Sequence, residues 1–367
     1  MNSEISRIIS SIEPLDVKAV ELAKERQAKL AKPPGSLGLL EDISVRFAGI
    51  TGKVKNSAES CRIIVLCADN GIIEEGVSSA PRSVTMAQAV NMTKRLTGMS
   101  AMAKFFGNDV VVADLGIADD YDCPQILDRK LMKGTRNFLK EDAMDRETCE
   151  KAILTGIELA KDAKEAGMDV IGVGEMGIGN TSTSSAVLSV LTGLSVTEVT
   201  GRGGGLTDSA FAHKKEVLEQ AIALRKADKN DPIDVLSKLG GLDIAAMCGV
   251  YLGAAAYRLP VVIDGFISVV AALCAARICP AAKDFMFPSH ESYEPGYKAA
   301  IKELGLTPWL GLGMRLGEGS GCPIAFQVIR AACAAMNGMA LFGEESVIDD
   351  GYLEDIRKGD SFTVERK

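Results

Sequence analysis

Short apolar runs alternate with segments of helical spacing through the middle of the chain. Four apolar runs, each followed by a glycine or polar turn, are predicted to be buried strands: residues 62–68, 109–115, 168–173 and 259–263. Apolar residues that recur every three or four positions predict helices at residues 84–96, 145–167, 186–191, 210–225, 233–239 and 266–278. This alternation predicts an α/β fold with a mainly parallel, doubly wound sheet.

Both ends of the chain have helical spacing and no strand pattern. The helices predicted there are residues 15–32, 37–50, 294–304 and 323–342. We expect the two ends to pair as a small helical domain, made of residues 1–59 and 291–367, beside a large α/β domain at residues 60–290. Residues 127–140 are weakly patterned, so their structure stays open.

One stretch, Met168–Val187, joins a predicted strand to a predicted helix through a glycine-rich turn. Its glycines are Gly172, Gly174, Gly177 and Gly179. Asn180 and the hydroxyl residues after it are typical helix N-caps, and free N–H groups at the positive end of a helix dipole bind anions. The glycine spacing also fits a dinucleotide fingerprint, with Glu198 about 20 residues further on. These residues alone leave a dinucleotide site and a simpler phosphate site open.

Composition narrows the class of protein. The 367 residues are 47% apolar, include 37 glycines and carry a net charge of −8, which suits a compact α/β enzyme. We expect no nucleic-acid partner, because the sequence has no basic run or basic-aromatic patch. We expect no membrane span, because no run of 18 apolar residues occurs. Nine cysteines without a CxxC pair, and no signal-peptide pattern, predict free thiols in a reducing cytoplasm.

Three further features are candidates for chemistry. Asp264 ends a predicted strand and is either a helix cap or a carboxylate that faces a ligand. The TGRGGGL loop at residues 200–206 either connects two helices or approaches a phosphate or ribose. Glu318, among the glycines of MRLGEGSG, is either a solvated loop residue or a general base or acid in a cleft. The two histidines, His213 and His290, form no metal-ligand or triad pattern, so no metal is expected.

Several motifs together resemble one enzyme family. In chain order they are KPPGSLG (32–38), ADNG with EEGVS (68–78), PRSVT with Gln88, GEMGIGNT (174–181), TGRGGGL (200–206), DGF (264–266), SHESYEPG (289–296) and LGEGSG (316–321). They cover nearly the whole chain, and the pair GEMGIGNT and LGEGSG is highly specific. The chain resembles the nicotinate-nucleotide:5,6-dimethylbenzimidazole phosphoribosyltransferases, which make the lower-ligand nucleotide of cobamides such as vitamin B12.

The resemblance implies a large Rossmann-like domain, a small helical domain from both chain ends, and a homodimer. It implies transfer of 5-phosphoribose from nicotinate mononucleotide to an aromatic base, with Glu318 as general base and no cofactor. The residues expected at the phosphate and ribose are Glu175, Gly177, Ile178, Gly179, Asn180, Thr181, Gly203, Gly204, Lys214 and Ser292. Those expected in the acceptor-base pocket are Ala80, Gln88, Leu316 and Asp264. One carboxylate suffices, because the pyridinium of nicotinate mononucleotide is already an activated leaving group.

Three alternatives stay open. Ala80 stands where some relatives have serine, so the acceptor can be 5,6-dimethylbenzimidazole, another benzimidazole, a purine or a phenol. The glycine spacing with Glu198 leaves an NAD-dependent dehydrogenase as the runner-up, although no hydride-transfer partner is evident. A non-catalytic paralogue that serves only as a dimer partner or as a base-binding regulator is the third, and the intact Glu318 argues against it.

Overall fold

A parallel sheet forms the centre of the molecule, a computed structural model that describes residues 1–343, 348 and 350–353. In the described residues the sheet has six strands in the order β3-β2-β1-β4-β5-β6, and every neighbouring pair is parallel. The strands are β1 (Cys61–Ala68), β2 (Asp109–Gly116), β3 (Leu127–Asp128), β4 (Val170–Met176), β5 (Val261–Ile263) and β6 (Met286–Pro288). The strand order reverses between β1 and β4, where doubly wound sheets bind ligands at the carboxyl ends of the strands. The predicted fold class is confirmed.

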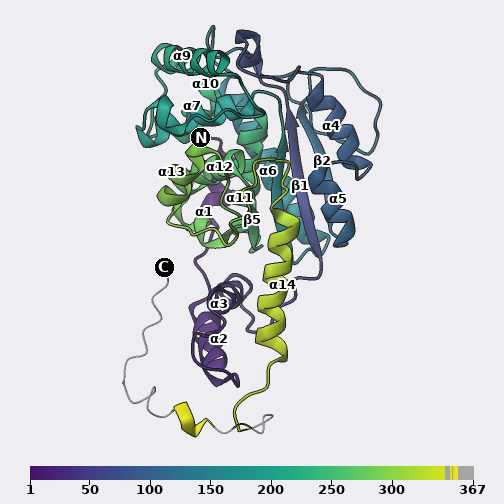
Figure 1. The fold of residues 1–367 in the computed structure, drawn as a ribbon, viewed down its shortest axis with the longest axis vertical. Helices are drawn as coiled ribbons and strands as arrows, with labels where there is room; N and C mark the ends of the chain where they lie inside the picture. Colours follow the sequence, from purple (N-terminus) through teal and green to yellow (C-terminus); the bar gives the residue numbers. More distant parts are fainter. Residues whose placement is uncertain (344–347, 349, 354–367) are drawn as a thin grey trace. The chain divides into compact units, whose positions relative to one another are not determined.

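Helices cover both faces of the sheet. Those of the α/β region are α4 (Val84–Thr93), α5 (Gly98–Phe105), α6 (Arg146–Glu165), α7 (Asn180–Thr192), α8 (Val196–Val199), α9 (Asp208–Arg225), α10 (Pro232–Leu239), α11 (Leu242–Ala256), α12 (Phe266–Ile278) and α13 (Pro295–Leu304). Both α4 and α11 contact β1, β2 and β4, and they lie on opposite sides of these strands (Figure 1). Almost every residue of α11 and α12 is buried, which explains why their sequences are apolar on all sides.

Three short 3-10 helices complete the described elements: η1 (Gly71–Glu75), η2 (Pro280–Phe285) and η3 (Gly351–Leu353). The first directly follows β1, and the second connects α12 to β6.

The chain divides into two compact units. The larger one contains Met1–Glu13 and Ser60–Ala325, and the smaller one contains Pro14–Glu59 and the described residues from Phe326 onward. Within the smaller unit, α2 (Val17–Lys29) packs on α3 (Leu39–Thr51), and the Arg26 side chain donates a hydrogen bond to the Met336 carbonyl at 2.7 Å. Met336 belongs to α14 (Cys322–Gly338), which begins in the larger unit.

This division differs from the predicted boundaries at residues 1–13 and 291–325. The sequence placed both segments in the small helical domain, but their apolar side chains pack in the larger unit. Ile5 of α1 (Ser3–Ser10) is fully buried, and α1 contacts α11. The helix α13 packs against α12, and its Tyr297 is fully buried.

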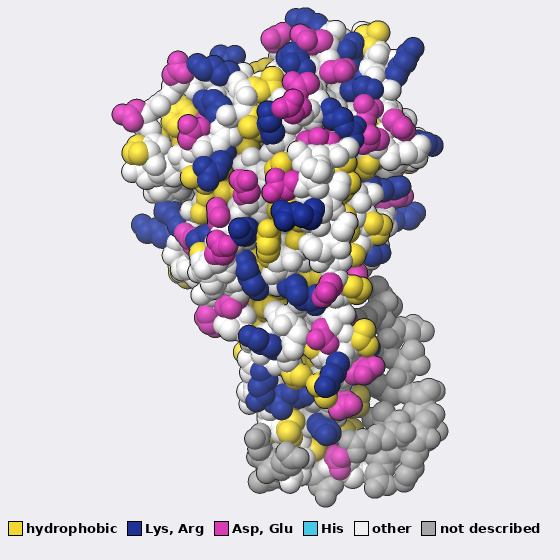
Figure 2. All heavy atoms as spheres, turned by 180° about the vertical axis from the view of Figure 1, so that it is seen from behind, with side chains coloured by type: hydrophobic (Ala, Val, Ile, Leu, Met, Phe, Trp, Pro, Cys, Tyr) yellow, Lys and Arg dark blue, Asp and Glu magenta, His cyan; other side chains and the backbone are white. Residues whose placement is uncertain are grey.

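The charged side chains on one face of the molecule are mixed in sign, as expected from a sequence without a basic run (Figure 2). On the face shown in Figure 2, basic and acidic side chains are interspersed rather than gathered by sign. Among the described residues, no helix is long and apolar enough to cross a membrane.

Candidate active site

A cavity of about 260 Å³ lies at the carboxyl ends of β4 and β5, within the larger unit. The predicted site residues that line it are Ala80, Gln88, Glu175, Gly177, Ile178, Gly179, Asn180, Thr181, Gly203, Gly204, Ser292, Leu316 and Glu318, together with their loop neighbours. The fold therefore brings together motifs that are more than 200 residues apart in the sequence, at the sheet edge where ligands bind. Lys214 and Asp264 are the predicted site residues that do not line it.

Glu318 lies on a loop that the surrounding residues hold in an uncommon backbone conformation. Gly317, Glu318 and Gly319 have φ values of 80°, 65° and 86°, and such left-handed values are costly for a residue with a side chain. The backbone of Glu318 packs directly on Gly174 of β4, where a Cβ atom would lie 2.5 Å from the Glu318 carbonyl oxygen. The close approach of this loop to β4 therefore requires glycine at position 174.

The predicted role of Asp264 in the acceptor-base pocket is not supported by its position. Its carboxylate is buried behind the Glu318 loop, where Oδ2 accepts a hydrogen bond from the Gly319 N–H at 3.0 Å and Oδ1 accepts one from the Gly321 N–H at 2.6 Å. Burial raises the pKa of Asp264 to about 7, and the hydrogen bonds from the two glycine N–H groups oppose that rise. Asp264 thus fixes the loop that carries Glu318 instead of facing a ligand.

The carboxylate of Glu318 is held from both sides. Gln88 Nε2 donates to Glu318 Oε1 at 3.3 Å, and the Met99 N–H donates to Oε2 at 3.3 Å. Asn91 Nδ2 donates to Gln88 Oε1 at 2.9 Å and so orients the Gln88 amide. Met99 is in the first turn of α5, whose N-terminus stabilises a negative charge. These contacts hold the Glu318 side chain at the cavity wall, where it is 5% exposed.

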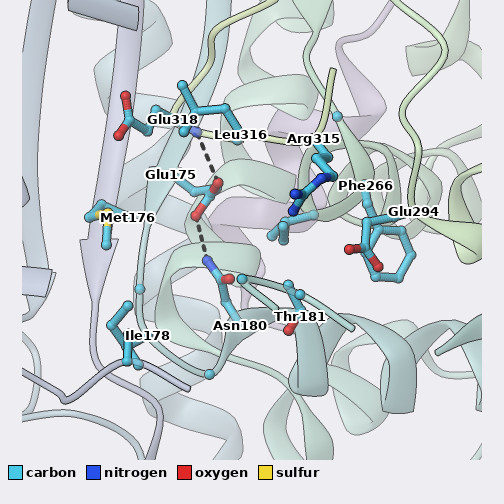
Figure 3. A pocket seen from close by; sticks show the side chains of 18 of the residues that line it. Glu175, Met176, Ile178, Asn180, Thr181, Phe266, Glu294, Arg315, Leu316 and Glu318 are labelled. Atoms are coloured by element: carbon cyan, nitrogen blue, oxygen red, sulfur yellow. Dashed lines mark hydrogen bonds between the residues drawn. The ribbon is translucent and has the colours of Figure 1, made fainter. Parts of the chain in front are cut away.

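Glu175 and Asn180 lie between Glu318 and the glycine turn (Figure 3). Asn180 Nδ2 donates to Glu175 Oε2 at 2.5 Å, and the Glu318 N–H donates to Glu175 Oε1 at 3.1 Å. Burial raises the pKa of Glu175 to about 7, and these two hydrogen bonds act in the opposite direction. Asn180 Nδ2 also donates to Asp243 Oδ2 at 3.1 Å.

The glycine turn presents the N-terminus of α7 to the cavity. Gly179 has a φ of 95° and is the N-cap of this 13-residue helix. Thr85 Oγ1 accepts a hydrogen bond from the Ile178 N–H, and the Gly177 carbonyl accepts one from the Asn180 N–H. Within the described part of the chain, no acceptor meets the N–H groups of Gly179 and Thr181. A helix N-terminus of this kind suits a phosphate group.

Lys214 adds positive charge beneath this turn. Its side chain on α9 is fully buried, and Nζ donates to Thr181 Oγ1 at 2.9 Å and to the Gly201 carbonyl at 3.4 Å. Burial lowers the pKa of Lys214 to about 8, and the nearby Glu294 carboxylate works against that change. Lys214 therefore acts through Thr181 rather than from the cavity wall.

Arg315 and Met99 belong to the site although no sequence motif singled them out. Arg315 lines the cavity, and in the view of Figure 3 it lies between Leu316 and Phe266. Its position next to Leu316 in the LGEG motif was the available signal. The sequence signal for Met99 is the pair Thr97 and Ser100, which forms a capping box at the start of α5. This box places the Met99 N–H in the first turn of the helix.

Glu198, the acid of the dinucleotide fingerprint, has a local structural role. Its side chain is exposed and accepts hydrogen bonds from Ser195 N at 2.9 Å and Ser195 Oγ at 2.7 Å, as the capping box of α8. It does not line the cavity, so Glu198 is not placed to read the ribose of a dinucleotide bound there. Among the described residues, no group of three or more His, Cys, Asp or Glu side chains is arranged to hold a metal ion.

Comparison with known proteins places the chain among the phosphoribosyltransferases. The family model described as Phosphoribosyltransferase matches residues 12–347. A Nicotinate-nucleotide–dimethylbenzimidazole phosphoribosyltransferase of Clostridium perfringens is 51% identical over 360 residues, which cover 98% of this chain and 99% of the relative. A protein of the same name from Ruminiclostridium cellulolyticum is 49% identical over 339 residues, 92% of this chain and 96% of the relative.

A solved structure is similar to this chain as well. The crystal structure of CobT from Thermus thermophilus matches with a TM-score of 0.85 and 35% sequence identity, and the match covers 89% of this chain and 98% of that one. The chain belongs to the family of nicotinate-nucleotide–dimethylbenzimidazole phosphoribosyltransferases.

Proposed function

We propose that the chain transfers the 5-phosphoribosyl group of nicotinate mononucleotide to a ring nitrogen of 5,6-dimethylbenzimidazole or a closely related base. The products are nicotinate and the α-ribotide used for the lower ligand of a cobamide. The observation that carries the proposal is the position of Glu318, whose carboxylate faces the same cavity as the N-terminus of α7.

The two halves of the cavity suit the two substrates. Leu316, Met176 and Ile178 form an apolar wall beside Glu318, while Thr181 and Arg315 lie across the cavity (Figure 3). A flat aromatic base fits the apolar half, where Gln88 and Ala80 also line the wall. The phosphate fits the other half, against the start of α7 and near the cations Lys214 and Arg315.

This arrangement holds the reacting groups around C1′ of the donor. The acceptor nitrogen that bears no hydrogen attacks C1′. At the same time the other ring nitrogen of the acceptor loses its proton to Glu318. The bond between C1′ and the pyridinium nitrogen breaks, and its electron pair neutralises the ring, so the leaving group needs no acid. Attack opposite the leaving group inverts C1′ and gives the α-ribotide. Alignment of both rings supplies much of the rate, and anchoring the phosphate keeps C1′ in place.

Replacing Glu318 tests this role. Glu318→Gln keeps the size of the side chain but removes the base, so kcat should fall about 10²- to 10⁴-fold while the Kd for nicotinate mononucleotide stays within about twofold. Glu303→Gln, on the outer part of α13 where Glu303 pairs with Arg277, is the matched control and should keep normal kcat. A normal kcat in Glu318→Gln would exclude Glu318 as the base.

We also propose that the enzyme acts in the cytoplasm as a dimer. Nine buried free cysteines support a reducing compartment. Sedimentation of the purified chain, with and without nicotinate mononucleotide, measures the oligomeric state directly.

A further inference from the structure

Asp243 is a fully buried carboxylate that the proposed reaction does not use. It lies in the first turn of α11 and does not line the cavity. Its Oδ2 accepts a hydrogen bond from Asn180 Nδ2 at 3.1 Å, and its Oδ1 accepts one from the Ile244 N–H at 3.0 Å. Two glycines pack closely against the Asp243 carboxylate. A Cβ at Gly177 would lie 2.8 Å from Oδ2, and a Cβ at Gly241 would collide with Oδ1.

The Asn180 amide group is consequently fixed between two carboxylates. Its Nδ2 donates one hydrogen to Glu175 and the other to Asp243. Carboxylate oxygens accept hydrogen bonds, so only the NH₂ side of the amide can face both of them. The amide oxygen must then point the other way, and Figure 3 shows it directed toward Thr181 and the cavity.

An amide oxygen at this point can select one part of the donor. It accepts hydrogen bonds and repels the oxygens of a phosphate or of the nicotinate carboxylate. In the ionised donor the 2′ and 3′ hydroxyls of ribose are the groups that can donate a hydrogen bond. Thr181, the next residue, lines the half of the cavity proposed for the phosphate, so a ribose attached to that phosphate lies near the Asn180 amide.

We propose that Asp243 is a positioning residue that, together with Glu175, turns the Asn180 amide so that its oxygen accepts a hydrogen bond from a ribose hydroxyl of the donor. This inference rests on the proposed donor, nicotinate mononucleotide. Asp243→Asn has nearly the same shape but can offer an NH₂ group to Asn180. The opposite orientation of the Asn180 amide then becomes acceptable, and it places NH₂ where the hydroxyl needs an acceptor.

Donor binding tests this without turnover. Calorimetry at pH 8, without acceptor base, measures the Kd of nicotinate mononucleotide and of its 2′-deoxy and 3′-deoxy analogues. The pKa values of Glu175 and Asp243 are both raised by burial to about 7, so both side chains are largely ionised at this pH. A hydrogen bond is worth up to about tenfold in affinity, so the wild-type protein should bind one analogue about five- to tenfold more weakly than the full donor.

In Asp243→Asn the preference for the hydroxyl should shrink to less than about twofold, with weaker binding of the full donor and unchanged binding of that analogue. A loss of affinity that is equal for all three ligands would overturn the inference, because it would mean general damage to the site. Asn180→Ala, which keeps Asp243, provides a second route if Asp243→Asn does not fold, and it should lose the same preference.

Two further results are decisive. Equal binding of all three ligands by the wild-type protein would overturn the inference without any variant. A wild-type protein that binds none of them would instead contradict the proposed function, so the two failures are distinguishable.

Discussion

Gly174→Ala tests whether the position of Glu318 depends on the close approach of its loop to β4. The new Cβ would lie 2.5 Å from the Glu318 carbonyl oxygen, 2.9 Å from its carbonyl carbon and 3.1 Å from Gly319 Cα. Ordinary contacts begin at 3.4 Å, so the loop must retreat by about 0.9 Å. All three contacts involve backbone atoms, so no side-chain rotation can relieve them.

A displacement of about 1 Å at a catalytic group costs roughly 100-fold in rate. We therefore expect kcat to fall about 100-fold in Gly174→Ala, and the free energy of unfolding to fall by about 1–3 kcal/mol from overpacking. The Kd of nicotinate mononucleotide should change little, because the start of α7 is held by other contacts.

Steady-state kinetics, calorimetry and urea unfolding measure the three quantities. Gly311→Ala is the matched control, since a Cβ there meets open space and the loop backbone is not left-handed. A kcat within twofold of wild type in Gly174→Ala would refute the argument that the tight contact between Gly174 and Glu318 sets the geometry of the base.

Two further variables should respond in defined ways. Because burial lowers the pKa of Lys214 to about 8, its charge is lost as the pH rises through that value, and affinity for nicotinate mononucleotide should fall between pH 7 and pH 9. Calorimetry with nicotinate riboside, which lacks the phosphate, is the control, and an equal pH dependence for both ligands would exclude Lys214 as the cause. Asp264→Asn leaves one acceptor oxygen for the N–H groups of Gly319 and Gly321. We expect kcat to fall at least tenfold and the free energy of unfolding to fall by about 1–3 kcal/mol. Unchanged kinetics in that variant would show that Asp264 does not support the Glu318 loop.

The central strands could be predicted from the sequence because they are buried on both faces and form continuous apolar runs. The predicted runs at residues 62–68 and 109–115 correspond closely to β1 and β2. The edge strands β3 and β6 are two and three residues long, too short to produce a recognisable period. Their pairing depends on the rest of the sheet.

Site residues could be predicted from the sequence where a local motif determines the position of the side chain. Glu318 and Asn180 were expected in one site, and both line the same cavity. Asp264 shows the limit of this reasoning. Its place at the end of β5 was evident, but which distant N–H groups would occupy its oxygens depends on how the Glu318 loop folds back over it.

Incubation of the purified chain with nicotinate mononucleotide and 5,6-dimethylbenzimidazole, with both products measured by chromatography, tests the proposed transfer itself. We expect nicotinate and the α-ribotide of the base to form in equal amounts, and nicotinate release to depend on the base. Release of no nicotinate, or release without any ribotide, would contradict it.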